Sequence, residues 1–307
     1  MTSPDAAMAE RRSRRRRRLG VGGIGIACLD LGQGVPVVLL HGPGTSSALW
    51  EPVAAQLSER AAVRCHVPDL PGWGASDPLP GPGGGDQGLD AWRDVVDELL
   101  VGLDAAERAV IGGHGWGATL AFDRARRHPH ETIGVIHADA VARPLWSSEL
   151  STPTRKLVER LRADDRDRLV ADPDAWVDDL LSGWEAANRA VERELRAALV
   201  DGPAAVRRAF LDATRCVPID GSPATGAGEL AAIAEHMAIA DVPKLHVEGD
   251  PGWFLGPATR AFVGGWPNQR TVRVDAAHLT PLSYPTLIAD AISSWLVDVV
   301  GVRAGTG

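Results

Sequence analysis

The chain has 307 residues, a formal net charge of −8 and 45% hydrophobic residues. This length suits one large α/β domain with an insertion, or two small domains, and it is enough to bury a sizeable core. No apolar run is long enough to span a membrane, and three widely spaced cysteines predict neither a disulfide framework nor a metal cluster. We therefore expect a cytoplasmic protein with no membrane partner and no metal site.

Positive charge is concentrated at the start of the chain. Seven arginines lie between Arg11 and Arg18, against Asp5 and Glu10, so residues 1–19 have a charge of about +5 and the remaining chain about −13. A block of like charges is usually solvated, so we predict an Arg-rich disordered tail over residues 1–19. The acidic remainder would repel phosphate groups, so we expect no nucleic-acid partner.

The residues after the tail alternate between strand and helix patterns. The run Val37–Leu40 is continuously apolar, as expected of a buried parallel strand, and a Gly-Gln-Gly turn separates it from a strand that begins near Gly25. Apolar positions that repeat on one side predict helices, and short apolar runs between turn residues predict strands. In chain order these are helix Ser47–Leu57, a strand and loop within Ala61–Asp77, helix Leu89–Leu103, strand Ala109–Ile111, helix Ala118–Arg127 and strand Thr132–His137.

A different pattern follows from about Pro144 to Ala240. It consists of charged, alanine-rich amphipathic helices with no strand candidate. The strand–helix alternation resumes at Pro243 and ends in a helix over Tyr284–Val300. An all-helical segment inside such a series is typical of a lid. The predicted divisions are a core of residues 20–143 and 241–302 and a helical cap of residues 144–240.

The segment Ala109–Phe122, "AVIGGHGWGATLAF", predicts a strand, a tight glycine-rich turn and the start of a helix. It resembles the elbow of an α/β-hydrolase, whose pattern is G-x-Nuc-x-G with serine, cysteine or aspartate at the centre. Here Gly115 occupies the central position, between His114 and Trp116. Glycine has no side chain, so it can form no ester with a substrate.

Six motifs along the chain resemble those of the haloalkane dehalogenase group of α/β-hydrolases, which includes the Renilla-type luciferase branch. They are "HGPGTSSALW" (His41–Trp50), "PDLPGWGASD" (Pro68–Asp77), "GHGWGATLAF" (Gly113–Phe122), "GVIHADAVARPLW" (Gly134–Trp146), "PKLHVEGDPGWF" (Pro243–Phe254) and "AAHLTPL" (Ala276–Leu282). The resemblance implies an α/β-hydrolase fold, with a mostly parallel central sheet flanked by helices and an all-helical lid insertion.

The same resemblance implies roles for several residues. In this group an elbow aspartate attacks carbon, a histidine near the last strand activates water, and an acid orients that histidine. His278 matches the histidine, Asp139 matches an acid placed after the sixth strand, and Asp250 matches the alternative placement after the seventh. Trp116 matches a tryptophan that helps to hold halide. Both acids are present, so the choice between them stays open.

Two positions depart from this pattern. Gly115 replaces the nucleophile, and Pro43 replaces the residue after His-Gly whose backbone N–H completes the oxyanion hole. Proline has no backbone N–H, and an oxyanion donor contributes about 2.7–4 kcal/mol in the transition state. Because each change removes a separate part of the same machinery, covalent hydrolysis is disfavoured.

The remaining histidine and acid can still move protons. We expect His278, with Asp139 or Asp250, to act as a general acid–base without a covalent intermediate and without a cofactor, in epoxide opening, cyclisation, elimination or carbon–carbon bond formation. Ten tryptophans against one tyrosine favour a bulky, polycyclic aromatic substrate, as in natural-product tailoring. Two alternatives are a non-catalytic ligand-binding protein and a degenerate or engineered hydrolase. The predicted substrate-binding residues are Pro43, Trp73, His114, Gly115, Trp116, Trp146, Trp253 and Phe254.

Overall fold

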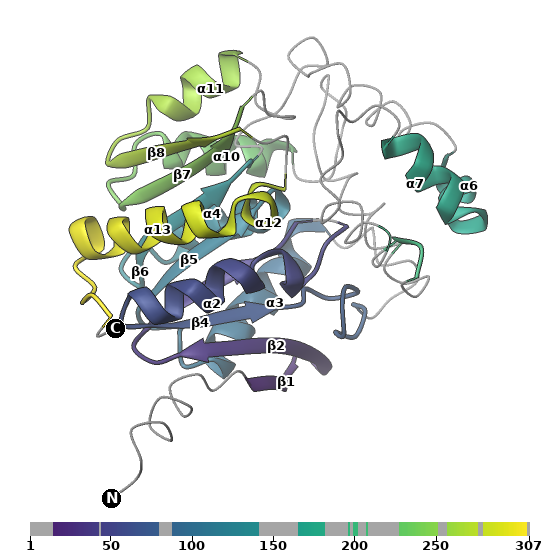
Figure 1. The fold of residues 1–307 in the computed structure, drawn as a ribbon, viewed down its shortest axis with the longest axis horizontal. Coiled ribbons are helices and arrows are strands. Elements are labelled where there is room, and N and C mark those ends of the chain that lie inside the picture. The colour runs from purple at the N-terminus through teal and green to yellow at the C-terminus, as the bar shows by residue number, and fades with distance from the viewer. Residues whose placement is uncertain are drawn as a thin grey trace, which may run out of the picture.

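An eight-stranded sheet lies at the centre of the fold (Figure 1). The computed structural model describes residues 15–42, 44–79, 88–140, 165–181, 196, 199–201, 207, 227–250, 257–275 and 279–305. The strands lie in the order β1-β2-β4-β3-β5-β6-β7-β8, with β1 and β2 antiparallel to their neighbours and the others parallel. They are β1 (Arg15–Val21), β2 (Ile24–Gly32), β3 (Val35–Leu40), β4 (Val63–Pro68), β5 (Ala109–His114), β6 (Thr132–Ala138), β7 (Lys244–Gly249) and β8 (Gln269–Val274).

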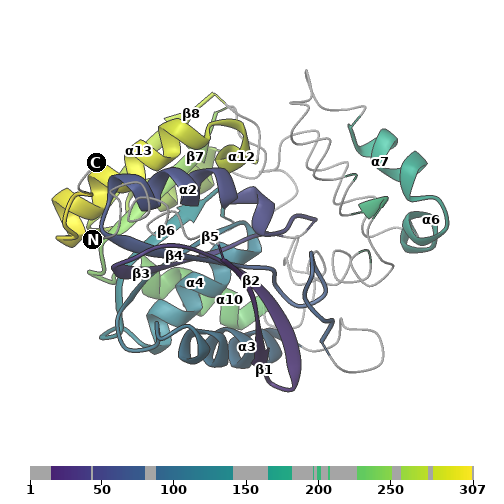
Figure 2. The same cartoon turned by 60° about the horizontal axis from the view of Figure 1, so that its bottom comes forward.

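Helices cover both faces of this sheet (Figure 2), and each face has its own apolar core. Trp50 and Ile288 are buried in the core under α2 and α13, and Phe122 and Trp266 in the core under α3 and α4. The arrangement confirms the predicted α/β-hydrolase fold. The helices are α2 (Glu51–Arg60), α3 (Gly88–Gly102), α4 (Trp116–Arg127), α6 (Asp165–Ala171), α7 (Pro173–Leu181), α10 (Ala227–Met237), α11 (Pro257–Gly264), α12 (Thr280–Ser283) and α13 (Pro285–Trp295). Among the described helices, none has the length and apolar character needed to cross a bilayer.

Two predicted helices differ from those observed. The predicted helix Ser47–Leu57 is a 3-10 turn, Ser47–Leu49, followed by α2, and Pro52 lies in the first turn of α2, where a missing N–H costs nothing. The last predicted helix is α13 followed by the π-helical turn Leu296–Val300. That turn ends at Gly301, whose φ of 79° is left-handed, as is common after a helix C-terminus.

Helix α10 belongs to the layer that covers the sheet. Its residues Ile233 and Met237 are buried in the same apolar core as Phe122 of α4, and Arg93 of α3 lies 3.2 Å from Glu229. The predicted cap of residues 144–240 therefore ends too late, because it includes this helix. Residues 141–164 and most of 182–226 lie outside the described part, so the rest of the core–cap division stays a prediction.

The predicted tail of residues 1–19 is also too long, since β1 begins at Arg15. The arginines of β1 are paired with acidic residues from distant parts of the chain. Arg16 lies 3.1 Å from Glu51, Arg17 lies 2.9 Å from Asp30, and Arg18 pairs with Asp77. These pairs neutralise the like charges that would otherwise keep the segment solvated, and β2 supplies the backbone partners.

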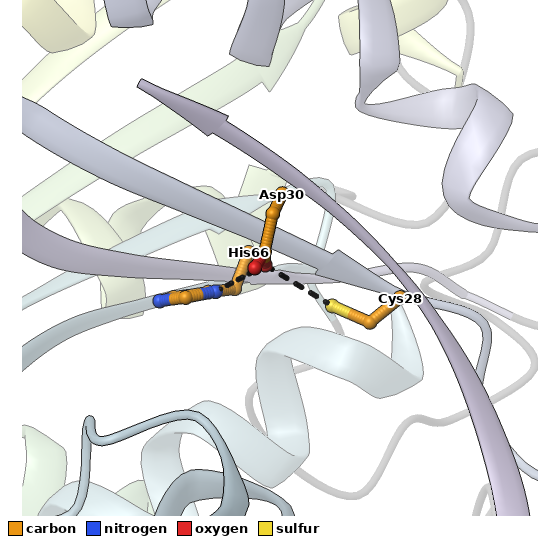
Figure 3. Close-up of side chains that lie close together, drawn as sticks. All are labelled: Cys28, Asp30 and His66. Atoms are coloured by element: carbon orange, nitrogen blue, oxygen red, sulfur yellow. Dashed lines mark hydrogen bonds and ion pairs between the residues drawn. The ribbon is translucent and has the colours of Figure 1, made fainter. Parts of the chain in front are cut away.

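Asp30 of β2 is the centre of a buried network that includes Cys28 of the same strand and His66 of β4 (Figure 3). Its carboxylate lies 2.9 Å from both Arg17 and Arg64 and 2.6 Å from Nδ1 of His66, and Cys28 Sγ lies 3.9 Å away. Burial would raise the pKa of Asp30, but the hydrogen bond from His66 and the two guanidinium groups lower it overall. Cys28, Asp30 and His66 are residue types that can bind a metal ion, and their side chains lie together here. The Asp30 carboxylate, however, already has three partners, namely the two guanidinium groups and the imidazole.

A stacked histidine pair lies in the other half of the sheet. His137 of β6 and His246 of β7 are cross-strand neighbours, and their buried rings stack with centroids 4.5 Å apart and an interplanar angle of 7°. Burial and nearby positive charge lower the pKa of both rings, that of His246 to about 4. The protein therefore folds with both imidazoles neutral.

We expect His246→Phe to reduce the acid sensitivity of folding. Between pH 6.5 and pH 4 the unfolded histidine binds a proton that the folded ring does not, so the free energy of unfolding falls as the pH falls, by about 3 kcal/mol for His246. Urea unfolding at several pH values should show a shallower slope in the variant. His130→Phe, at an exposed position, is the control, and equal slopes for His246→Phe and wild type would refute the expectation.

Candidate active site

The elbow predicted from the glycine-rich turn is present between β5 and α4. Gly115 has φ 54° and ψ −117°, a backbone conformation that L side chains rarely adopt. Its N–H donates to the carbonyl of Ala138 at the end of β6 (3.1 Å), and its carbonyl accepts from Ala118 (3.1 Å). The elbow is therefore fixed against the neighbouring strand end and against the first turn of α4.

The glycines on either side of Gly115 are required by close packing. A Cβ on Gly113 would lie 2.1 Å from the backbone of Gly117, and a Cβ on Gly117 would lie 2.4 Å from the carbonyl oxygen of Leu40. A Cβ on Gly115, in contrast, would meet no atom of the described residues within 4 Å. As far as the described residues show, position 115 therefore has room for a side chain in the place where the fold normally holds a nucleophile, and the sequence supplies none.

The loop after β3 is held beside the elbow by His41. Its Nδ1 lies 2.8 Å from the carbonyl of Gly42, and its Nε2 accepts from the N–H of Leu70 (2.8 Å). Burial lowers the pKa of His41, so the ring is neutral and joins two loops. Thr45 adds a hydrogen bond to Gly42 (2.8 Å). Pro43, the second departure from the family pattern, lies outside the described residues.

Asp139 lies directly after β6, next to the elbow. It is 1% exposed, and its φ of 43° is unusual for a residue other than glycine. Oδ1 accepts from the N–H of Gly249 (3.0 Å), whereas Oδ2 is buried with no partner among the described residues. Burial raises the pKa of Asp139 to about 8, although the Gly249 N–H and the nearby Thr280 hydroxyl oppose this shift. This carboxyl group binds a proton far more strongly than an exposed aspartate does.

Asp250, the other predicted acid, has a different environment. Its side chain is 62% exposed, and its carboxylate lies 3.5 Å from the guanidinium of Arg260. Its backbone N–H continues the contact of β7 with β8 by donating to Val274 (2.8 Å). Asp250 therefore faces solvent and an arginine, whereas Asp139 is enclosed beside the elbow.

Aromatic side chains form a connected row that reaches the elbow. Trp116 is 6% exposed and lies edge-on to Trp92, which packs on Trp73, and Trp73 in turn lies edge-on to His41. Trp73, one of the predicted substrate-binding residues, is completely buried and contacts His41 and Trp92. Trp92, which is not among the predicted site residues, is buried in the core and contacts Trp116.

The remaining predicted site residues are placed only in part. His114 is buried at the end of β5, and a Cβ on Gly42 would lie 2.8 Å from its Nδ1, so the ring packs against the loop after β3. His278, Trp146, Trp253 and Phe254 lie outside the described residues. Thr280, two positions after His278, begins α12 and lies close enough to Asp139 to affect its pKa.

Comparison with known proteins agrees with this architecture. Residues 37–291 match the alpha/beta hydrolase family. A haloalkane dehalogenase from Sphingobium indicum is 31% identical over 276 residues, which cover 88% of this chain and 91% of that protein. A coelenterazine h 2-monooxygenase from Renilla reniformis is 27% identical over 275 residues, covering 86% of this chain and 84% of that protein.

Solved structures show the same fold. The crystal structure of the haloalkane dehalogenase DatA from Agrobacterium tumefaciens C58 superposes with a TM-score of 0.79 and 24% sequence identity, covering 92% of this chain and 96% of that one. The family match, the relative with 31% identity and the eight-stranded sheet lead to one conclusion. The chain belongs to the α/β-hydrolase family, in its haloalkane dehalogenase group.

Proposed function

We propose that this protein catalyses a non-hydrolytic reaction by general acid–base catalysis, with no covalent bond between substrate and protein. The observation that carries the proposal is Gly115: the elbow keeps its φ of 54° and the room for a side chain, but it has no nucleophile. Pro43 supports it from the sequence, because proline offers no N–H to a developing oxyanion.

The similarity to haloalkane dehalogenases does not decide the reaction. One of the relatives is named as a monooxygenase, so proteins of different reaction classes share this group. The members of the fold differ in the chemistry placed at the elbow and the strand ends. The missing nucleophile therefore carries more weight for this chain than the names of its relatives.

In the proposed mechanism, His278 takes a proton from one substrate atom and returns it to another, and Asp139 is its partner. Asp139 is chosen over Asp250 because it is buried, lies next to Gly115 through the hydrogen bond of Ala138, and has a second oxygen without a partner among the described residues. A carboxyl group enclosed beside the elbow can hold an imidazole in one orientation and exchange a proton with it.

The proposed substrate is a bulky polycyclic aromatic molecule, as in natural-product tailoring. Trp116 supports it, because this indole directly follows Gly115 in the chain and contacts a second indole, Trp92. Without a side chain at position 115, a flat substrate can approach the backbone of the elbow. Epoxide opening, cyclisation, elimination and carbon–carbon bond formation all fit, since each needs a positioned proton donor and acceptor.

Phenanthrene 9,10-oxide in H₂¹⁸O tests the proposal. Isomerisation by proton transfer gives phenanthrol, which contains no water oxygen, whereas hydrolysis gives a labelled dihydrodiol. We expect unlabelled phenanthrol above the uncatalysed rate, no adduct by intact-mass spectrometry, and a loss of at least about 100-fold in His278→Ala. Binding followed by tryptophan fluorescence, with no product and no effect of His278→Ala, would favour the ligand-binding alternative.

Gly115→Asp tests the degenerate-hydrolase alternative. A Cβ at position 115 would meet no atom of the described residues within 4 Å, so the aspartate can be introduced there. If this variant releases chloride from 1-chlorohexane over many turnovers, the glycine is the sole defect of a dehalogenase and the weight placed on Pro43 is wrong. We expect at most one chloride per protein molecule and an alkyl adduct by intact-mass spectrometry, because displacement of chloride needs only the new carboxylate, whereas hydrolysis of the resulting ester needs the oxyanion donor that is still missing.

A further inference from the structure

Asp139 is linked to a buried ion pair through Gly249. The N–H of Gly249 donates to Asp139 Oδ1 (3.0 Å), and the carbonyl of the same residue accepts from Nη2 of Arg260 (3.0 Å). Nη1 of Arg260 lies 2.5 Å from Oε1 of Glu248. Two hydrogen bonds therefore connect the Asp139 carboxylate to the ion pair, and Gly249, at the end of β7, makes both of them.

Glu248 and Arg260 are less exposed to solvent than the other charged side chains nearby. The side chain of Glu248 is 2% exposed and that of Arg260 is 20% exposed. Arg273 of β8, 3.3 Å from Glu248, and Asp250, 3.5 Å from Arg260, are 67% and 62% exposed. Water screens the two exposed groups, so the charges that act on Asp139 most directly are Glu248 and Arg260.

We infer that Arg260 and Glu248 are positioning residues for Asp139: they hold Gly249 against its carboxylate, and their opposite charges bias its protonation in opposite directions. Glu248 favours the protonated carboxyl group, and Arg260 favours the carboxylate. Burial is the largest cause of the raised pKa of Asp139, and these two charges adjust it in opposite directions. The consequence for turnover rests on the proposed function; the effect on Asp139 itself does not.

The test is a titration of the Asp139 carboxyl group by ¹³C NMR. Protein labelled at the aspartate carboxyl carbons gives a resonance for Asp139 that is assigned by its absence in Asp139→Asn. We expect Arg260→Gln to raise the titration midpoint and Glu248→Gln to lower it, each by up to about one pH unit. Both variants break the same ion pair, so mere loosening of the structure would move the two midpoints in the same direction.

Two further variants keep the test decisive if a glutamine variant fails to fold. Arg260→Lys keeps the positive charge but not the second arm of the guanidinium, so its midpoint should lie between those of wild type and Arg260→Gln. Arg273→Gln, at the exposed position, should leave the midpoint within about 0.3 units of wild type. Midpoints that move together in the two glutamine variants, that stay fixed in both, or that move as far in Arg273→Gln as in Arg260→Gln would overturn the inference. An adduct or a labelled dihydrodiol with phenanthrene 9,10-oxide would contradict the proposed function but would not change this titration.

Discussion

Between pH 4 and pH 8, Asp139 should lower the free energy of unfolding of the wild-type protein by about 5 kcal/mol, and Asp139→Asn should abolish this pH dependence. Burial raises the pKa of the folded carboxyl group from its ordinary value of 3.8 to about 8, so the folded protein binds a proton in this range that the unfolded chain has lost. The contribution of Asp139 to stability is therefore full below pH 4 and declines as the pH rises to 8. Asparagine has the same shape and does not titrate.

Urea unfolding of wild type and Asp139→Asn at half-unit pH steps measures this effect. The difference between the two curves isolates Asp139, because all other titrating groups are shared. Asp250→Asn is the matched control, since its carboxylate is mostly exposed, and it should leave the wild-type profile unchanged. Parallel profiles for wild type and Asp139→Asn would mean that Asp139 ionises as an exposed aspartate does.

The parts of the fold that could be predicted from the sequence are those with a local signal. The apolar run of β3, the amphipathic pattern of α3 and the glycine-rich elbow at Gly115 each lie within a short window, and all are found close to their predicted positions. Strand β5 extends to His114, beyond the predicted end at Ile111, because the glycines between them allow close packing against Gly117 and Leu39.

Features that depend on distant residues could not be predicted in this way. The arginines of β1 have the pattern of a solvated tail, because their partners Glu51, Asp30 and Asp77 are 13 to 59 residues away in the chain. The choice between Asp139 and Asp250 was open for the same reason: both follow strands, and only the packing of β6 against β7 shows that one is buried and the other exposed.

Gly117→Ala should destabilise the protein more than Gly115→Ala. A methyl group at position 117 would lie 2.4 Å from the carbonyl oxygen of Leu40 and 2.6 Å from that of His41, and these backbone atoms belong to β3 and the loop that follows it. Because the core strands cannot shift freely, we expect a loss of about 3–5 kcal/mol in the free energy of unfolding. Urea unfolding at pH 7 measures it.

Gly115→Ala is the control for this loss, because its methyl group meets no atom of the described residues within 4 Å. The expected cost is that of the strained backbone at φ 54° and ψ −117°, about 1–3 kcal/mol for alanine. Similar losses at positions 115 and 117 would contradict the open space at the elbow. A smaller loss of stability at position 115 than at position 117 would mean that the fold still accepts a side chain where a nucleophile normally lies. Packing would then not explain the glycine at position 115, and the explanation would lie in the chemistry of the site.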